Sequence, residues 1–273
     1  MKSLVLILFC FFSIVSRARG VPRLVSTAPS ITESIVYLGK KGAIVGVSNF
    51  CQYEEMMPRV GSAITPNYEK IISLKPDKVL VLKTANSSME KSLKKLNLPY
   101  VSLSFNSLDE ILGSVLILGK ETGAIKESKK FVSDVKSELI PIRDVIEKTY
   151  VWVISSETDN GMINKVMVAG SGTHYHNIIK LLGFYTPKGI LPNYHSLSLE
   201  QLIKMKPDYI FVSTPGNLSN EVLAKVRSSW EKMKILEAVK NKKVFIFSGD
   251  EFVIPGTSIL KMIKKVKGAI GAP

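Results

Sequence analysis

The sequence contains few of the residues that small exported proteins and metal enzymes depend on. Its 273 residues include only two cysteines and three histidines. Two cysteines, Cys10 and Cys51, cannot build a disulfide framework, and Cys51 is expected to be a small packed thiol. No glycine-rich phosphate loop, nucleophile elbow or metalloprotease helix occurs, and the segment Gly170-Ser171-Gly172 lacks nucleotide-binding spacing. The sequence therefore gives no support to an enzyme, although α/β folds host many reactions.

Acidic residues are also scarce relative to basic ones. The chain has 23 Asp and Glu against 37 Lys and Arg, for a net charge of +14. Such a balance is found in nucleic-acid-binding proteins. Here the lysines are spread along the chain and no DNA- or RNA-binding motif accompanies them, so we expect no nucleic-acid partner. Weak attraction to anionic membrane surfaces or ligands is the alternative use of this charge.

Long apolar runs are limited to the N-terminus. Lys2 precedes an apolar run over residues 4–15, and the small-residue segment Ala18-Arg19-Gly20 follows it. The run is too short to span a bilayer as a mature helix, and its pattern predicts a signal peptide over residues 1–20. Losing these residues removes three basic residues and no acid, which leaves a mature charge of +11. An uncleaved anchor is the alternative, whereas lipid attachment at Cys10 is disfavoured by the bulky residue before it.

Beyond residue 20 short apolar strands alternate with helical patterns. The first half shows strands at 23–26, 43–47, 78–82 and 100–103, with a helix at 107–119. Another helix begins after Ser30, which is expected to cap it with Glu33 at capping-box spacing. The second half shows strands at 150–154, 209–212 and 243–247, with helices at 176–182, 221–233 and 257–267. This alternation predicts an α/β fold with parallel sheets.

Residues 121–148 follow a different pattern. Apolar residues recur there at helical spacing, and a helix of that length would extend for roughly 40 Å. We interpret it as a connector between an N-terminal lobe at 21–120 and a C-terminal lobe at 149–273. Pro141 is expected to kink it.

An internal repeat supports two similar lobes. The segment Glu69–Val81 matches Glu200–Val212, with identical Glu, Ile, Lys-Pro-Asp and Val positions. Each copy predicts a short amphipathic helix, a turn in which proline ends the helix, and a buried strand. Two related lobes leave a cleft between them, where ligand sites commonly form.

Five segments carry a resemblance to a known family. They are residues 25–33, 44–48, 58–61, 67–77 and 197–202. With them the chain resembles, over about residues 23–268, the helix-linked (class III) periplasmic solute-binding proteins of ABC importers. This family serves the import of cobalamin, haem and iron-siderophores, and the chain is most similar to cobalamin-binding members. The resemblance implies two Rossmann-like lobes joined by one helix, a periplasmic location and no cofactor.

The same resemblance implies a function and partners. We expect a monomer that captures cobalamin or a related corrinoid in the interlobe cleft and delivers it to a permease dimer. An iron-siderophore or haem ligand is the alternative, and a surface sensor on the same fold is less favoured. Family members dock on the permease through one glutamate per lobe, and the matching positions are Glu69 and Glu200. The alternative is that each glutamate only stabilises a helix N-terminus.

Ligand contacts are expected from loops at the strand ends that face the cleft. In the N-terminal lobe these are Pro29, Ser30, Asn49, Phe50, Ser62, Ala63 and Lys83. In the C-terminal lobe they are Ser171, His174, Tyr175, Tyr194, His195, Glu251 and Phe252.

Some of these positions depart from the family pattern. Cobalamin-binding relatives carry tryptophans near Ala63 and Glu251, and haem-binding relatives carry a tyrosine where this chain has Ser62. His174 or His195 could ligate a metal ion through a neutral ring nitrogen. The simpler alternative is that such histidines lie at a helix start or face solvent.

Overall fold

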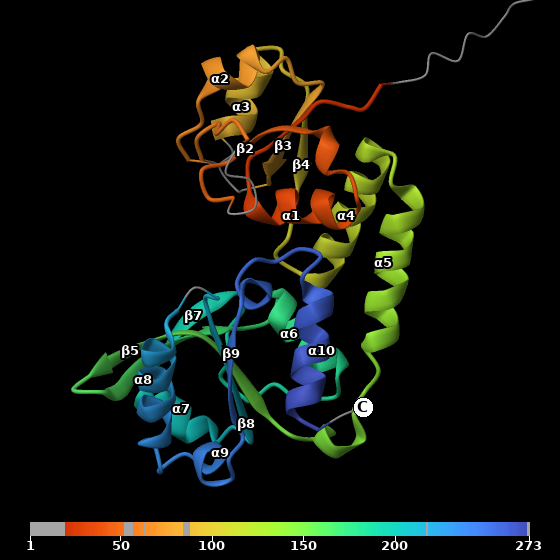
Figure 1. The fold of residues 1–273 in the computed structure, drawn as a ribbon. Helices are drawn as coiled ribbons and strands as arrows, with labels where there is room; N and C mark the ends of the chain where they lie inside the picture. The colour runs from red at the N-terminus through yellow and green to blue at the C-terminus, as the bar shows by residue number, and fades with distance from the viewer. Residues whose placement is uncertain (1–19, 52–56, 63, 84–87, 217, 272–273) are drawn as a thin grey trace, which may run out of the picture.

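The computed structural model describes residues 20–51, 57–62, 64–83, 88–216 and 218–271. The chain forms two lobes, one above the other in Figure 1. The expected signal peptide, apart from Gly20, lies outside the described residues, as does Ala63.

The N-terminal lobe is a parallel sheet between two layers of helices. Its strands are β1 (Leu24–Ser26), β2 (Ile44–Val47), β3 (Lys78–Leu82) and β4 (Tyr100–Leu103), in the order β2-β1-β3-β4. Helices α1 (Pro29–Tyr37) and α4 (Leu108–Thr122) pack on the face that carries Leu24 and Leu80. Helices α2 (Tyr68–Ser73) and α3 (Ser88–Lys95) cover Val25, Val79 and Val81 on the other face. Both faces are buried, which explains the uninterrupted apolar strands of the sequence.

The C-terminal lobe has a five-stranded sheet in the order β7-β6-β5-β8-β9. Its strands are β5 (Tyr150–Asp159), β6 (Met162–Ala169), β7 (Tyr194–Ser198), β8 (Tyr209–Thr214) and β9 (Val244–Ser248). Strands β5, β8 and β9 are parallel as expected, whereas β6 and β7 are antiparallel additions. This sheet is therefore mixed, where the sequence predicted only parallel strands. Asn160 and Gly161, both at positive φ, form the tight turn between β5 and β6.

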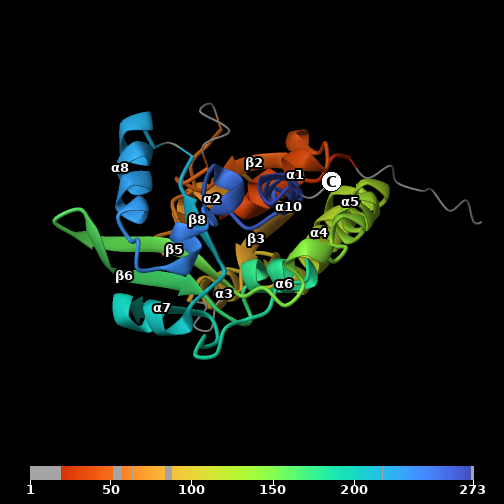
Figure 2. The ribbon, with the colours of Figure 1, turned by 90° about the horizontal axis from the view of Figure 1, so that it is seen from below.

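Helices cover both faces of this second sheet. Helices α6 (His174–Leu181) and α10 (Ile259–Ala269) pack on the aromatic face, which carries Trp152 and Phe211. Helices α7 (Leu199–Met205), α8 (Asn220–Glu231) and α9 (Glu237–Lys240) cover the aliphatic face. In Figure 2, α7 and α8 lie at the left of the molecule, whereas α6 lies to their right, next to α4. Two single turns, η2 (Arg143–Val145) and η3 (Asp250–Phe252), precede β5 and follow β9, and a third, η1 (Lys41–Ala43), precedes β2.

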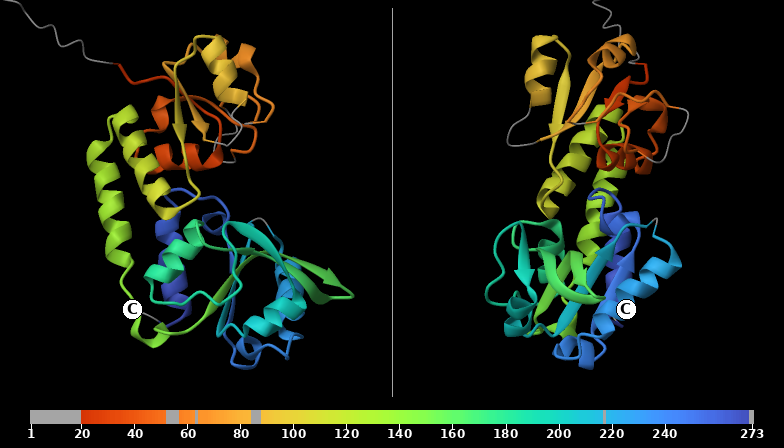
Figure 3. Two further views of the ribbon diagram at one scale, coloured as in Figure 1. Left: turned by 180° about the vertical axis from the view of Figure 1, so that it is seen from behind. Right: turned by 90° about the vertical axis from the view of Figure 1, so that its left-hand side faces the viewer.

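The connector between the lobes is shorter than the helix expected over residues 121–148. Helix α4 ends at Thr122, and Gly123 in the left-handed region (φ 72°) closes it. A separate helix, α5 (Ile125–Glu138), then leads to the C-terminal lobe and extends for only about 21 Å. Figure 3 shows α4 and α5 side by side along one edge of the molecule. Pro141 lies beyond the end of α5, so the expected kink in a helix at this residue is wrong.

The start of α1 also differs from the expectation. The helix begins at Pro29 with Ala28 at its N-cap, and no side chain caps it. Proline already has the φ angle that a first helical residue needs, so Ser30 lies inside the first turn.

The internal repeat is confirmed as a structural repeat. Asn67 caps α2 and Ser198 caps α7. Each helix is followed by a lysine in the left-handed region, Lys75 at φ 47° and Lys206 at φ 48°. The strand that follows pairs in parallel with the first strand of its lobe, β3 with β1 and β8 with β5.

Candidate ligand-binding cleft

The carboxyl ends of the N-terminal strands meet the C-terminal lobe at a cavity of about 330 Å³. Loops at the carboxyl ends of parallel strands are the usual ligand sites of α/β folds. The N-terminal lobe contributes the residues that follow β1, β3 and β4, and the C-terminal lobe contributes the segment after η3. The lining residues are Ala28, Pro29, Ser30, Leu82, Lys83, Leu103, Phe105, Asn106, Val253, Ile254 and Pro255.

Three of the expected contact residues line this cavity, namely Pro29, Ser30 and Lys83. Sequence reasoning missed Phe105, Asn106 and the segment 253–255. Phe105 and Asn106 lie two and three residues after the end of β4, so the strand-end rule already applied to the other loops would have found them. Phe105 is buried, whereas Asn106 and Lys83 are exposed and offer an amide and an ammonium group to a ligand.

Hydrogen bonds join the two lobes beside the cavity. The Asn106 carbonyl accepts a hydrogen bond from the His174 N–H at 2.7 Å. The Leu108 N–H donates to Asn177 Oδ1 at 3.2 Å. The first turns of α4 and α6 are thereby fixed against each other, and the loop that carries Asn106 is held by both lobes.

The histidines at the start of α6 are buried and neutral. Burial lowers the pKa of His174 to about 4, and it also lowers the pKa of His176. His174 Nδ1 has no hydrogen-bond partner among the described residues, whereas His176 Nδ1 lies 3.0 Å from the Tyr150 hydroxyl. The helix is capped by Thr173, whose Oγ1 accepts from the His176 N–H at 3.3 Å. In the part of the chain that the structure describes, no cluster of His, Cys, Asp and Glu side chains could hold a metal ion.

Tyr175 and Phe252 belong to an aromatic cluster in the core of the C-terminal lobe. Tyr175 stacks on Trp152 with ring centroids 4.9 Å apart, and Phe252 stacks on Phe247 at 4.7 Å. The Tyr175 hydroxyl donates to the Phe252 carbonyl. Both side chains are buried, so ligand contact by either would require this packing to open.

Glu251 is buried as well and is held by two lysines. Lys265 pairs with its Oε1, and Lys261 lies 3.4 Å from its Oε2. Burial raises the pKa of this carboxyl, but the hydrogen bond and charge of Lys265 outweigh burial, so the net shift of the pKa is downward. Glu251 is therefore an ionised structural group beside the cleft.

The other expected contact residues lie outside the cavity. Asn49 and Phe50 are exposed, Phe50 at 69%. Ser62 is occupied in a local turn, where its Oγ lies 3.0 Å from Thr65 Oγ1. The remaining three lie in or near β7. Ser171 forms a β-bridge with Pro192, just before the strand, and Tyr194 is 45% exposed at its start. His195 Nε2 accepts a hydrogen bond from the Leu191 N–H at 3.3 Å.

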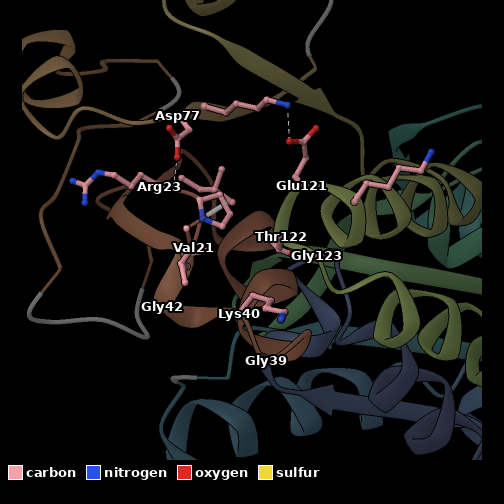
Figure 4. Close-up of a pocket in the computed structure, with 15 residues that line it drawn as sticks. Val21, Arg23, Gly39, Lys40, Gly42, Asp77, Glu121, Thr122 and Gly123 are labelled. Carbon is pink, nitrogen blue, oxygen red and sulfur yellow. Dashed lines mark hydrogen bonds and ion pairs between the residues drawn. The ribbon is translucent and has the colours of Figure 1, made fainter. Parts of the chain in front are cut away.

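A larger cavity of about 910 Å³ lies at the opposite end of the N-terminal lobe (Figure 4). It surrounds the point where the chain enters β1 and is bordered by Lys40, Gly42 and Gly123. Both acids that line it are already paired: Lys78 Nζ lies 2.6 Å from Glu121, and the Arg23 N–H donates to Asp77 at 2.7 Å. It lies at the amino ends of the strands, away from the loops that converge on the cleft, so we do not take it as the ligand site.

Glu69 and Glu200 occupy equivalent exposed positions. Each is the second residue of its helix, α2 or α7, and lies in the first turn. Glu200 also pairs with Lys204 at 2.6 Å, an exposed contact that contributes little stability.

Residues 24–250, most of the chain, match the family described as periplasmic binding protein. The chain belongs to the periplasmic binding protein family. It is an ABC transporter substrate-binding protein of the vitamin B12, haem and iron-siderophore type, and proteins of this family are not enzymes. The family implies a permease partner and a small-molecule ligand.

Curated relatives and solved structures agree with this assignment. The uncharacterized ABC transporter substrate-binding lipoprotein YvrC of Bacillus subtilis is 25% identical over 91% of this chain and 79% of its own length. The vitamin B12-binding protein of Vibrio parahaemolyticus is 23% identical over 97% of this chain and 96% of its own. The periplasmic haem-binding protein HutB of Vibrio cholerae shares the fold, with a TM-score of 0.73, 20% identity and coverage of 92% and 100%.

None of the helices in the described ranges is long and apolar enough to cross a membrane.

Proposed function

We propose that this protein captures a corrinoid such as cobalamin between its lobes and docks on an ABC importer permease dimer through Glu69 and Glu200. The cavity at the carboxyl ends of β1, β3 and β4, completed by residues 253–255, is the observation that carries the proposal. We further propose that the segment at 1–20 is a signal peptide that directs export. The lobes at 21–120 and 149–273 then bind the ligand together, and the protein acts as a monomer.

The cavity suits the edge of a large, mostly apolar ligand. Phe105, Val253 and Pro255 supply apolar surface, and Asn106 and Lys83 supply a small number of polar groups, which is the usual composition of a ligand pocket. Its 330 Å³ is at the lower end of the range for drug-sized ligands, so a corrinoid would extend beyond it. Phe50, which is exposed on the loop after β2, offers an aromatic face for the part outside.

An iron-siderophore or haem is the second candidate. Lys83 is exposed at the cavity and would attract the negative charge of a ferric chelate or of haem carboxylates. The chain shares its fold with a haem-binding protein, which is compatible with this candidate. However, haem-binding relatives carry a tyrosine where this chain has Ser62, and this difference disfavours haem.

Titration of the purified chain decides between these ligands. Cyanocobalamin, haemin and ferric enterobactin are added separately while tryptophan fluorescence and ligand absorbance are followed. We expect one-to-one binding of cyanocobalamin without turnover. Lys83→Ala and Asn106→Ala should each weaken it about three- to tenfold. Lys94→Ala, on α3, is the matched control and should change nothing. Binding of only haemin or only ferric enterobactin would replace the corrinoid assignment, and binding of none would refute capture of this ligand class.

Docking on the permease follows from the equivalent positions of the two glutamates. A carboxylate fixed at the start of a short helix in each lobe gives a two-point contact for a two-fold partner. Each exposed contact contributes only about 1 kcal/mol, so the pair sets orientation more than affinity.

A further inference from the structure

A groove of about 850 Å³ lies on the C-terminal lobe between α8, α9 and the last strand, β9. Its floor is apolar and is formed by Trp230, Val239, Val244 and Ile246. We call it the β9 groove. It lies on the aliphatic face of the sheet, and no residue that lines it lines the interlobe cavity.

Strand β9 ends the sheet, and no described strand pairs with its outer edge. In the parallel pairing of β8 with β9, Ile210 lies opposite Val244, and the Ile210 N–H donates to the Lys243 carbonyl at 3.0 Å. Backbone groups alternate in direction along a strand, so Lys243 and Phe245 face β8. The N–H and C=O groups of Val244 and Ile246 therefore face the open edge. Their side chains point into the β9 groove, because both pack with the core on that face.

Helix α8 supplies the opposite wall. Arg227, Trp230 and Glu231 lie on one face of this helix at i, i+3 and i+4, and Lys234 continues the row beyond its end. Trp230 is 1% exposed, and its indole N–H has no acceptor among the described residues. A buried donor without an acceptor is uncommon and unfavourable. A carbonyl or carboxylate that enters the groove could satisfy this donor after a small shift of the Trp230 side chain.

The rim of the groove is positively charged. It carries Arg227, Lys234, Lys240 and Lys242 against one acid, Glu231. Lys240 pairs with Glu237 at 2.6 Å. Within the described ranges no carboxylate lies at ion-pair distance from the other three cations. A second copy of the chain, joined edge to edge, would bring the same cations together and be repelled. An acidic partner would be attracted.

We propose that the β9 groove binds an extended acidic segment of a partner protein, which adds a strand to the outer edge of β9. Backbone hydrogen bonds to Val244 and Ile246 would supply affinity. Apolar side chains at every second position would enter the groove, and flanking acids would meet the cationic rim. Because this surface shares no lining residue with the interlobe cavity, the proposal is independent of which solute the cavity takes.

The probe is a capped synthetic peptide, Glu-Glu-Val-Thr-Val-Glu-Glu, added to the full mature chain labelled with ¹⁵N at tryptophan. The chain has two tryptophans, and the Trp152 indole N–H already donates to Ser213 Oγ at 3.3 Å. We expect the Trp230 indole resonance to shift in a saturable way while the Trp152 resonance stays in place. The Trp230→Phe variant assigns the two signals.

Two control peptides separate strand addition from charge attraction. Methylation of the central peptide nitrogens removes the donors that a new strand needs, and replacement of every Glu by Lys reverses the charge. We expect either change to weaken binding about tenfold or more. Equal binding of the methylated peptide would overturn strand addition, and equal binding of the lysine peptide would overturn acidic selectivity.

Two variants of the chain provide the reciprocal test. Ile246→Pro removes one N–H from the open edge and leaves the bonds to β8 in place. Arg227→Glu with Lys242→Glu reverses two rim charges. Each should weaken peptide binding about tenfold while the Trp152 signal and the far-UV circular dichroism stay unchanged, and Ile246→Val should bind normally. If the unmodified peptide does not bind, or if the charge reversal abolishes binding to phosphatidylglycerol vesicles but not to the peptide, the proposal is wrong. Concentration-dependent dimerisation that Ile246→Pro abolishes would also overturn it.

Discussion

Asp77 and Asp208 make the same backbone contact in the two lobes. The Asp77 carboxylate accepts a hydrogen bond from the Arg23 N–H, and the Asp208 carboxylate accepts one from the Thr149 N–H, each at 2.7 Å. Each aspartate closes the Lys-Pro-Asp turn of its lobe, and each donor, Arg23 or Thr149, lies just before the lobe's first strand, β1 or β5. The repeated turn therefore ties two neighbouring parallel strands together at their amino ends.

The two aspartates should differ in how much stability they contribute. Asp208 is partly buried and also accepts from Thr149 Oγ1 at 2.8 Å, whereas the Asp77 contact is exposed. We expect Asp208→Ala to lower the free energy of unfolding by about 2 kcal/mol and Asp77→Ala by about 1 kcal/mol. Urea denaturation followed by circular dichroism measures both. The Asn variants keep an acceptor and should lose less than half as much; equal losses for Ala and Asn at both sites would contradict this explanation.

The repeat was predictable from sequence because local chemistry determines it. A polar N-cap, an amphipathic turn of helix and Lys-Pro-Asp before an apolar strand specify the same unit in any context. The hairpin of β5 and β6 had an equally local signal in Asn160-Gly161, a dipeptide that suits a two-residue turn, and it was missed. Likewise Gly123 marked the end of α4, yet apolar periodicity alone predicted one continuous connector.

The site was less predictable than the fold because it depends on how loops from distant segments meet. Pro29, Ser30 and Lys83 could be named from strand ends. Residues 253–255 reach the cavity only because the C-terminal lobe folds back against α1, and Gly256 shows how close that approach is: a Cβ there would lie 3.3 Å from the Ser30 carbonyl. Burial of His174 and Tyr175 is likewise a result of tertiary packing, which no local pattern reveals.

Loss of Glu69 and Glu200, the two proposed docking residues, should abolish transport without changing capture. For Glu69→Ala combined with Glu200→Ala, we expect ligand affinity to stay within twofold of the parent. Uptake by vesicles that contain the cognate permease should fall to background. A large loss of ligand affinity would place these acids in the cleft instead.

Glu221 is the matched control for the alternative that the acids only stabilise helix N-termini. It is also the second residue of a capped helix, α8, with Ser219 as its N-cap. Each of the three Glu→Ala changes should lower stability by about 0.5 kcal/mol through loss of the helix-dipole interaction. Only those at positions 69 and 200 should affect uptake, and a similar effect of Glu221→Ala would refute docking.

Stability should fall as pH rises through neutrality because of Glu33. This side chain of α1 faces Ser258, Asp250 and Glu251 of the other lobe, and burial raises its pKa from 4.5 to about 7. A carboxyl whose pKa is higher in the folded state gives stability that is complete below pH 4.5 and is lost as pH rises through 7. The rise of this pKa from 4.5 to about 7 predicts a loss of about 2 kcal/mol between pH 5 and 7.5.

The Glu33→Gln variant isolates this contribution. Glutamine keeps the shape and a hydrogen-bond acceptor for Ser258 but does not ionise. Urea denaturation at several pH values measures the free energy of unfolding of both proteins. As pH rises from 5 to 7.5, the parent should lose stability relative to the variant. Glu69→Gln, on an exposed residue, should leave the pH profile unchanged. A parent and a Glu33→Gln variant with parallel profiles would show that Glu33 is ionised throughout.

Ligand binding should move the lobes little. Two separate contacts hold them together. Helix α5 packs on α10, where the Glu138 carboxylate pairs with Lys267 at 2.9 Å, and Asn177 accepts the Leu108 N–H between α6 and α4. Bending at one contact would strain the other, because packed helices have few alternative arrangements. We therefore expect the radius of gyration from small-angle X-ray scattering to change by less than about 1 Å when cyanocobalamin saturates the protein. Asn177→Ala with Glu138→Ala removes the polar interaction from each of the two contacts and should enlarge the change. A compaction of several ångströms in the parent protein would mean that these contacts break during capture.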